Sequence, residues 1–368
     1  MGKRHRRTRE SGSVRKLPSG KWQARVHHSD GTRTPLGTFS TKREADQSLT
    51  LATSDQLRGQ WIDPRRGQRT FEEYSKLWLE QRPLRPRTTE LYEYLLRLHI
   101  CPRLGGFELA ELTPIIVRQW FSELSGGTIG PSTVAKCYRL LRTILTTAVE
   151  DELITRNPCV IKGAGVERSA ERPVASVEQV RALADASDPR YRALILVATY
   201  TTLRLGELSA LTRRRVDLVS GTISVVDSAS EVGGQRIIGE PKTAAGRRTV
   251  TVPAAILPEL VEHMARYAGE GPDGLIFCGP MGAPLRRANW NERWRATTKK
   301  VGLEHLRFHD LRHTGNTLAA STGASTKELM SRMGHASPRA ALLYQHATSE
   351  REVAIARSLS ALIEAQSA

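Results

Sequence analysis

Residues 201–208 read TTLRLGEL and residues 309–314 read HDLRHT. Each stretch sets one arginine, Arg204 or Arg312, beside leucines. An arginine in apolar surroundings needs a partner, because an unpaired buried charge is costly. Glu207 follows Arg204 by three residues and can supply that partner along one helical face. Taken alone, such a pair is more often a structural ion pair than part of a functional site, so its meaning depends on the rest of the chain.

A lysine stands between the two arginine stretches. Residues 240–246 read EPKTAAG and separate two runs with strand character, residues 235–239 and 247–252. We therefore expect a hairpin with Lys242 at its tip. A lysine on such a loop is usually only a solvated charge, so this cluster establishes no function by itself.

The last cluster combines a histidine with a tyrosine. Residues 334–338 read GHASP, and Tyr344 follows His335 by nine positions. The serine suits an N-cap and the proline suits a first helical turn, so a short helix over residues 338–345 is expected to present Tyr344. A single histidine or tyrosine is more often packed in a core, and this cluster too is weak alone.

In this order, the four clusters resemble the tyrosine recombinase family, in particular phage-type integrases. The matching pattern is TxLRxGEL, PKT in a hairpin, HDLRHT, GH and then the tyrosine, and it covers residues 195–348. Two positions depart from it: Thr202 stands where the family usually has glycine, and Gly246 where serine often follows the lysine. The resemblance implies a site-specific recombinase that cleaves and rejoins DNA. It would integrate the genome of a phage or mobile element, and excise it with a partner.

The resemblance also implies which groups bind the DNA phosphate. Arg204 and Arg312 would bind its oxygens, because a guanidinium offers rigid paired donors, and His335 would add a third donor. Hydrogen-bond donors that are fixed in position before the reaction typically stabilise the transition state by several kcal/mol each. Glu207 would hold Arg204 in position without touching the substrate.

Three further groups would carry the bond and proton changes. Tyr344 would be the nucleophile and form a 3′-phosphotyrosine, with a 5′-hydroxyl leaving. Lys242 would protonate the leaving oxygen, and His309 would act as base for the tyrosine. His313, on the same helix as Arg312, is interpreted as packing or as support behind the site. The covalent step would conserve the energy of the phosphodiester bond, so no ATP, metal or other cofactor is expected, and the chain has no P-loop or HExxH motif.

The charge of the chain points to nucleic acid. Its 368 residues carry a net charge of +17 and its isoelectric point is about 10.2, so a polyanion is the expected partner. Residues 1–66 hold 15 Lys and Arg against 6 Asp and Glu. A small basic sheet in this part could lay one face in a DNA groove, and a small packing module is the alternative. The implied partners are double-stranded DNA at core and arm sites and three further copies of the chain in a homotetramer. The basic N-terminal module also suggests a host DNA-bending protein and an excision factor.

The composition also bears on the compartment. No run of about 18 apolar residues is present, so neither a membrane-spanning helix nor a membrane partner is expected. The first residues, MGKRHRR, lack the apolar run of a secretory signal. The cysteines form no CxxC pair, which is typical of a reducing cytosol. The resemblance implies that this is the cytoplasm of a bacterial host. The chain has four cysteines: Cys101, Cys137, Cys159 and Cys278.

We expect a mainly α fold with small β-sheets (α+β), in three domains. Residues 1–64 would form a basic sheet-plus-helix module that binds arm sites, residues 65–162 a core-binding domain of four helices, and residues 172–368 the mixed α/β catalytic domain. A linker is expected within residues 159–173. Residues 350–368 carry an apolar stripe, and in the family such tails dock on a neighbouring protomer. Packing of this tail on its own domain is the alternative.

Three alternative functions stay open. A resolvase or transposon recombinase would use the same chemistry, although simple resolvases usually begin with the helical domain. A DNA-binding protein without catalysis is disfavoured, because every expected catalytic residue is present. A metal-dependent nuclease could use four polar residues that share a helical face, and activity that survives EDTA would exclude it. Those four residues are His309, Asp310, His313 and Asn316.

Overall fold

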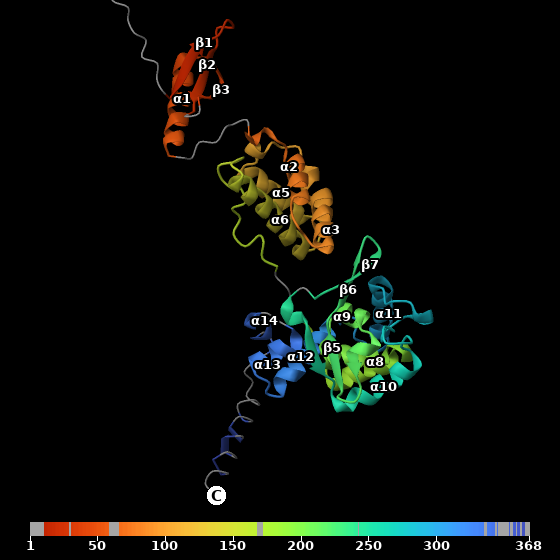
Figure 1. The fold of residues 1–368 in the computed structure, drawn as a ribbon. Helices are drawn as coiled ribbons and strands as arrows, with labels where there is room; N and C mark the ends of the chain where they lie inside the picture. Colours follow the sequence, from red (N-terminus) through yellow and green to blue (C-terminus); the bar gives the residue numbers. More distant parts are fainter. Residues whose placement is uncertain are drawn as a thin grey trace, which may run out of the picture. The chain divides into compact units, whose positions relative to one another are not determined.

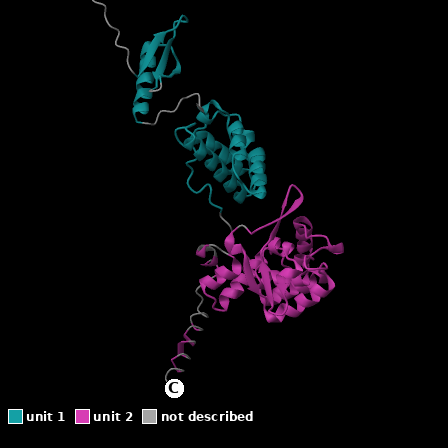
Figure 2. Ribbon diagram, viewed as in Figure 1, with its two compact units in different colours: residues 1–169 teal, residues 170–368 magenta. Residues whose placement is uncertain are grey.

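The computed structural model describes most of the chain. The described residues are 11–28, 31–58, 66–167, 172–241, 243–334, 337–342, Tyr344 and short pieces of the C-terminal segment (353, 356–357, 359–360 and 363–364). The chain divides into two compact units, residues 1–169 and 170–368 (Figure 2). Helices predominate and the sheets are small (Figure 1), which confirms the expected fold class. Within the described part of the chain, no helix is both long and apolar enough to cross a membrane.

The first unit begins with an antiparallel sheet and a helix that covers it. These elements are β1 (Gly12–Lys16), β2 (Trp22–His27), β3 (Arg33–Phe39) and α1 (Lys42–Leu57). The strands follow the order β1-β2-β3. Alternate residues of β2 share one face, so Ala24 and Val26 are buried together with Ala45 and Leu49 of α1. Thr41 starts the helix with a capping box, in which the Glu44 side chain accepts the backbone amide of Thr41.

The rest of the first unit is helical, as expected. Its helices are α2 (Phe71–Glu80), α3 (Pro86–Leu95), α4 (Cys101–Leu104), α5 (Pro114–Gly126) and α6 (Pro131–Glu150). α3 continues into α4 through a π-helical stretch, Leu96–Ile100. The helix widens into a π-helical turn here because Pro102 has no amide hydrogen to donate to the preceding turn. Phe71, Trp120 and Leu141 belong to the core of this helical part.

Within the expected linker, residues 159–167 contact the helical part of the first unit. Cys159 is buried in the helical core, and the amide of Ile161 donates to the hydroxyl of Tyr138 at 2.7 Å. Glu167 then pairs with Arg139 at 2.5 Å. The segment has no helical or strand periodicity, so its contacts with side chains of α6 could not be predicted from local pattern.

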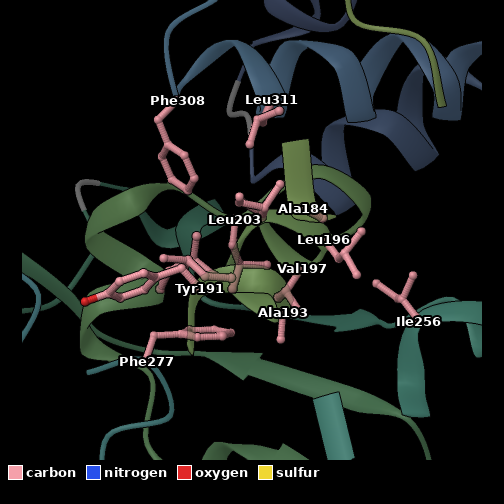
Figure 3. Packing of buried hydrophobic residues seen from close by; sticks show 14 of the residues in the cluster. Ala184, Tyr191, Ala193, Leu196, Val197, Leu203, Ile256, Phe277, Phe308 and Leu311 are labelled. Carbon is pink, nitrogen blue, oxygen red and sulfur yellow. The ribbon is translucent and has the colours of Figure 1, made fainter. Parts of the chain in front are cut away.

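The second unit is built around its own hydrophobic core (Figure 3). Its helices are α7 (Val177–Ala186), α8 (Pro189–Tyr200), α9 (Leu205–Ala210), α10 (Leu257–Arg266), α11 (Arg287–Lys300), α12 (Asp310–Ser321), α13 (Thr326–Met333) and α14 (Pro338–Leu342). Its strands are β4 (Val216–Asp217), β5 (Thr222–Val225), β6 (Ser228–Val232), β7 (Gln235–Gly239) and β8 (Arg248–Thr251). α8 contacts α7, α9, α10 and α12. Leu194 and Ile195 are therefore fully buried, as the apolar sequence of α8 predicts.

Helix α12 passes very close to the end of α8. A Cβ atom on Gly315 would lie 1.8 Å from the carbonyl oxygen of Thr199, so only glycine permits this approach. Arg312 precedes Gly315 by about one helical turn. The close contact therefore brings Arg312 to the segment that follows α8, where Arg204 lies.

The strands around the lysine loop differ from the expectation. β8 pairs with β5 in the sheet β4-β5-β8, whereas β7 pairs with β6 in a separate hairpin. The predicted hairpin with Lys242 at its tip is therefore wrong, because the loop between β7 and β8 joins two sheets. The sequence analysis missed β6, since Ser228–Val232 lacks a clear apolar alternation. Lys242 itself lies outside the described residues.

Candidate active site

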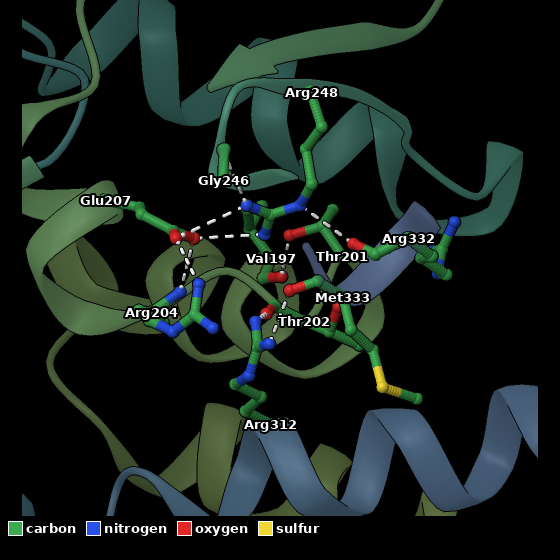
Figure 4. Close-up of polar contacts among 10 residues, drawn as sticks. All are labelled: Val197, Thr201, Thr202, Arg204, Glu207, Gly246, Arg248, Arg312, Arg332 and Met333. Atoms are coloured by element: carbon green, nitrogen blue, oxygen red, sulfur yellow. Dashed lines mark hydrogen bonds and ion pairs between the residues drawn. The ribbon is translucent and has the colours of Figure 1, made fainter. Parts of the chain in front are cut away.

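A buried carboxylate, Glu207, lies at the centre of the candidate site (Figure 4). Its Oε1 accepts a hydrogen bond from Nη1 of Arg204 at 2.8 Å, and its Oε2 accepts the backbone amide of Arg204 at 2.9 Å. The predicted ion pair is present, but the burial is distributed differently from the expectation. The Arg204 side chain is 39% exposed and the Glu207 side chain only 2%. Glu207 therefore fixes an arginine that solvent still reaches.

A second arginine, Arg248, binds the same carboxylate. Its Nη2 lies 3.0 Å from Oε2 of Glu207, and its side chain is 5% exposed. It also donates to the carbonyl oxygens of Gly246 at 3.2 Å and Arg332 at 2.8 Å. Arg248 thus ties Glu207 to the loop before β8 and to the last turn of α13. The sequence analysis missed it, although the period-two pattern of β8 sets Arg248 on the same face as the buried Val250.

The charge state of Glu207 follows from these contacts. Burial opposes ionisation, but the hydrogen bond and charge of Arg248, together with the contacts of Arg204, prevail and lower the pKa of Glu207. Glu207 is therefore ionised at neutral pH. One negative charge holds two guanidinium groups, so the cluster keeps an excess of positive charge that suits a phosphate.

Arg312 is almost completely buried, with 4% of its surface exposed. Its guanidinium donates to the carbonyl oxygen of Thr202 and, at 2.6 Å, to that of Met333 (Figure 4). Burial, and next the charge of Arg204, lower the pKa of Arg312 to about 9, while Tyr344 acts in the opposite direction. The group stays charged at neutral pH. Its contact with Thr202 sets Arg312 beside the segment that carries Arg204.

The tyrosine contacts a histidine that the sequence analysis had assigned to packing or support. The hydroxyl oxygen of Tyr344 lies 2.8 Å from Nδ1 of His313. His309 lies edge-on to His313, with 5.7 Å between the ring centres. Desolvation, and next the charges of nearby arginines, lower the pKa of His309 to about 4. Of the predicted site, the structure groups Arg204, Glu207, His309, Arg312 and Tyr344, whereas Lys242 and His335 lie outside the described residues.

The described residues do not form the set of metal ligands that the metal-dependent nuclease alternative requires. The carboxylate of Asp310 accepts the backbone amide of Arg307 at 2.8 Å and lies 3.6 Å from Arg172. The amide of Asn316 is buried and has no hydrogen-bond partner among the described residues. Across these ranges, no three His, Cys, Asp or Glu side chains are grouped as they would be around a metal ion.

Thr202, where the family usually has glycine, has a strained backbone. Its φ is +58°, which costs a residue with a side chain about 1–2 kcal/mol, and its buried hydroxyl has no partner among the described residues, which costs about 1–3 kcal/mol. Glycine would relieve both costs and lose about 1–2 kcal/mol through flexibility and the missing methyl group. We expect Thr202→Gly to stabilise the second unit by about 1 kcal/mol and to raise its Tm by roughly 2–4 °C.

Calorimetry of the full chain tests this expectation, with Thr201→Gly as the control. Thr201 has an ordinary φ of −101°, and its hydroxyl donates to the carbonyl oxygen of Val197 at 2.6 Å. The control should therefore lower the Tm. A lower Tm for Thr202→Gly would contradict the strain argument.

The chain is similar to known proteins along nearly its whole length. Residues 174–351 match the family described as "Phage integrase family", residues 70–125 match "Phage integrase, N-terminal SAM-like domain" and residues 10–58 match "Phage integrase, N-terminal domain". The chain is 37% identical over 377 residues to a Mycobacterium tuberculosis sequence named as a prophage phiRv2 integrase, covering 99% of this chain and 98% of that protein.

Two solved structures have a similar fold. The first is the Tn1549 transposon integrase in complex with a circular intermediate DNA, with a TM-score of 0.70 and 22% identity over 79% of this chain and 99% of that one. The second is a lambda integrase tetramer bound to a Holliday junction, with a TM-score of 0.57 and 16% identity over 90% of this chain and 97% of that one.

Proposed function

Because the chain belongs to the phage integrase family of tyrosine recombinases, we propose that it is a site-specific integrase that forms a 3′-phosphotyrosine on Tyr344. Enzymes of this family are DNA transesterases. One observation carries the proposal for this chain: Arg312 donates to the carbonyl oxygen of Thr202, two residues before Arg204, while Tyr344 contacts His313, the residue next to Arg312. A nucleophile and two cationic donors are thus grouped from three separate stretches of the sequence.

The two arginines bind the non-bridging oxygens of the scissile phosphate in this proposal. Negative charge on these oxygens grows in the transition state, and a fixed guanidinium stabilises it without reorganisation. Glu207 holds Arg204 through both its side chain and its backbone amide. Two backbone carbonyl oxygens hold Arg312. Both donors are therefore in position before DNA binds.

The bond changes follow from this arrangement. The oxygen of Tyr344 attacks phosphorus, the Tyr–O–P bond forms and the bond to the 5′-oxygen breaks. Lys242 protonates that leaving oxygen, and His335 donates a further hydrogen bond to the phosphate, both assigned from the sequence pattern. A 5′-hydroxyl of another strand then attacks the phosphotyrosine and reverses the steps, so the energy of the phosphodiester bond is conserved and ATP is not consumed.

The proposed partners are duplex DNA and further copies of the chain. The helical part of the first unit and the second unit bind the core site, and the basic N-terminal module binds arm sites, mainly through phosphates. Exchange between two duplexes requires four protomers, and lambda integrase was solved as a tetramer on a Holliday junction. Val353 and Leu359 of the C-terminal segment are 50% and 54% exposed, as suits docking on a neighbour. A host bending protein and an excision factor complete the reaction in the bacterial cytoplasm.

The proposal is tested by covalent capture. A random-sequence pool of nicked DNA duplexes is incubated with the full chain in EDTA, denatured in SDS, and searched for DNA attached to protein. We expect a protease-sensitive adduct in which the protein is attached to the 3′ end of the cleaved strand within one selected core sequence. The fragment that carries the 5′-hydroxyl is lost at the nick, so it cannot rejoin and release the protein. A protein that cuts DNA only after a divalent metal is added, without an adduct, would contradict the proposed function.

A further inference from the structure

The contact between Tyr344 and His313 is the starting point. Tyr344 follows α14, and His313 lies in the first turn of α12, 31 residues earlier. Their polar atoms are 2.8 Å apart and their ring centres 5.4 Å apart. The hydroxyl of Tyr344 thus points at one defined nitrogen, Nδ1.

The surroundings of His313 keep its ring able to accept a proton. The ring is half-buried, and desolvation, followed by the charge of Arg172, lowers its pKa. Asp310 acts in the opposite direction, and Arg312 adds to the lowering. The imidazole is therefore neutral at pH 7. With its proton on Nε2, it leaves the lone pair of Nδ1 directed at the phenol.

His309, the base expected from the sequence, is less suited to this role. Its pKa of about 4 makes it a weak proton acceptor at neutral pH. Its ring is placed against His313 rather than against the hydroxyl in any contact that the structure records. His309 remains available as a hydrogen-bond partner for DNA.

We propose that His313 is the general base that takes the proton of Tyr344 during attack on the scissile phosphate. The inference rests on the proposed function. The Tyr–O–P bond forms as the phenolic proton moves to Nδ1 of His313, and the P–O5′ bond breaks with protonation of the 5′-oxygen by the general acid. In the rejoining step, His313 returns the proton to the departing tyrosine oxygen. His313 is then a catalytic residue, because it touches a reacting atom.

The rate of adduct formation by the full chain on the captured nicked duplex tests this role. His313→Ala should form the adduct about 10²–10⁴-fold more slowly, with DNA binding unchanged, and imidazole in the buffer should restore part of the rate. His313→Asn keeps a hydrogen-bonding atom near the position of Nδ1 but cannot take the proton, so it should be as slow as the alanine variant. His305→Ala replaces an exposed histidine that precedes α12 and should cleave like the unaltered protein.

A modified DNA distinguishes loss of the general base from loss of the general acid. A sulfur in place of the bridging 5′-oxygen leaves without a general acid, so it should compensate for loss of the acid but not for loss of His313. The inference is overturned if His313→Asn reaches the full rate, if imidazole has no effect on His313→Ala, or if the sulfur substrate removes the defect. Absence of any adduct with the unaltered protein would refute the proposed function instead.

Discussion

Tyr344→Phe is expected to lose all detectable covalent attachment to DNA while binding the core duplex as the unaltered protein does. The variant keeps the aromatic ring but lacks the oxygen that attacks phosphorus. Removing the nucleophile of an enzyme with a covalent intermediate typically lowers the rate by at least about 10⁴-fold. Denaturing gels measure the adduct, and native gels measure binding.

Tyr200→Phe is the matched control for this variant. Tyr200 ends α8, and its contact in the site is made by its backbone carbonyl oxygen, which accepts from Arg332. Removing its hydroxyl leaves that contact in place, so adduct formation should continue at the normal rate. A denaturation-resistant adduct with Tyr344→Phe would show that another residue is the nucleophile. Loss of binding in that variant would show that the tyrosine serves recognition instead.

Arg248→Met is expected to destabilise the second unit by about 3–5 kcal/mol, because it leaves the carboxylate of Glu207 buried without its principal partner. The neighbouring Arg247 provides the control. It pairs with Glu240 at the surface, where the two side chains are 57% and 73% exposed. Arg247→Met should therefore cost less than about 1 kcal/mol. Denaturant unfolding of the full chain measures both, and equal effects would refute the buried-pair argument.

The difference in stability between the unaltered protein and Arg248→Met depends on pH in one direction. The pKa of Glu207 lies below its ordinary value of 4.5 in the folded chain. The stabilisation by its ion pairs is therefore fully present above about pH 4.5 and is lost as the pH falls through the lowered value. The stability difference between the unaltered protein and Arg248→Met should shrink in acid. A difference that stays constant in acid would mean that the charge of Glu207 does not contribute to it.

Local patterns predicted the helices well. Thr41, Thr70 and Ser176 each start a helix with a capping box, and the Thr-x-x-Glu or Ser-x-x-Gln pattern of such a box can be recognised in the sequence. Periodicity located the long helices of both units, since a helix is specified by residues within a few positions of one another. The same reasoning failed for β6, which lacks the apolar alternation on which the prediction depends, and the pairing of β7 with β6 was missed with it.

The residue types of the site and their order in the chain predicted its local contacts but not its long-range ones. The pair between Arg204 and Glu207 was expected, because the two residues are separated by a single helical turn. Arg248 as second partner of Glu207 was not, since 41 residues separate them and no periodic pattern reports such a contact. The contact of His313 with the tyrosine was missed for the same reason, because it depends on where α14 ends in space.

The absent side chain of Gly315 has a consequence for genetics. One added methyl group at this position would push α12 away from α8 and shift Arg312 and His313 together, although Gly315 is proposed to touch neither DNA nor the reacting groups. A screen for inactive alleles would then recover this glycine alongside the residues of the chemistry itself. Loss of activity on substitution of Gly315 would show how closely α8 and α12 must pack. It would not show that Gly315 contacts the substrate.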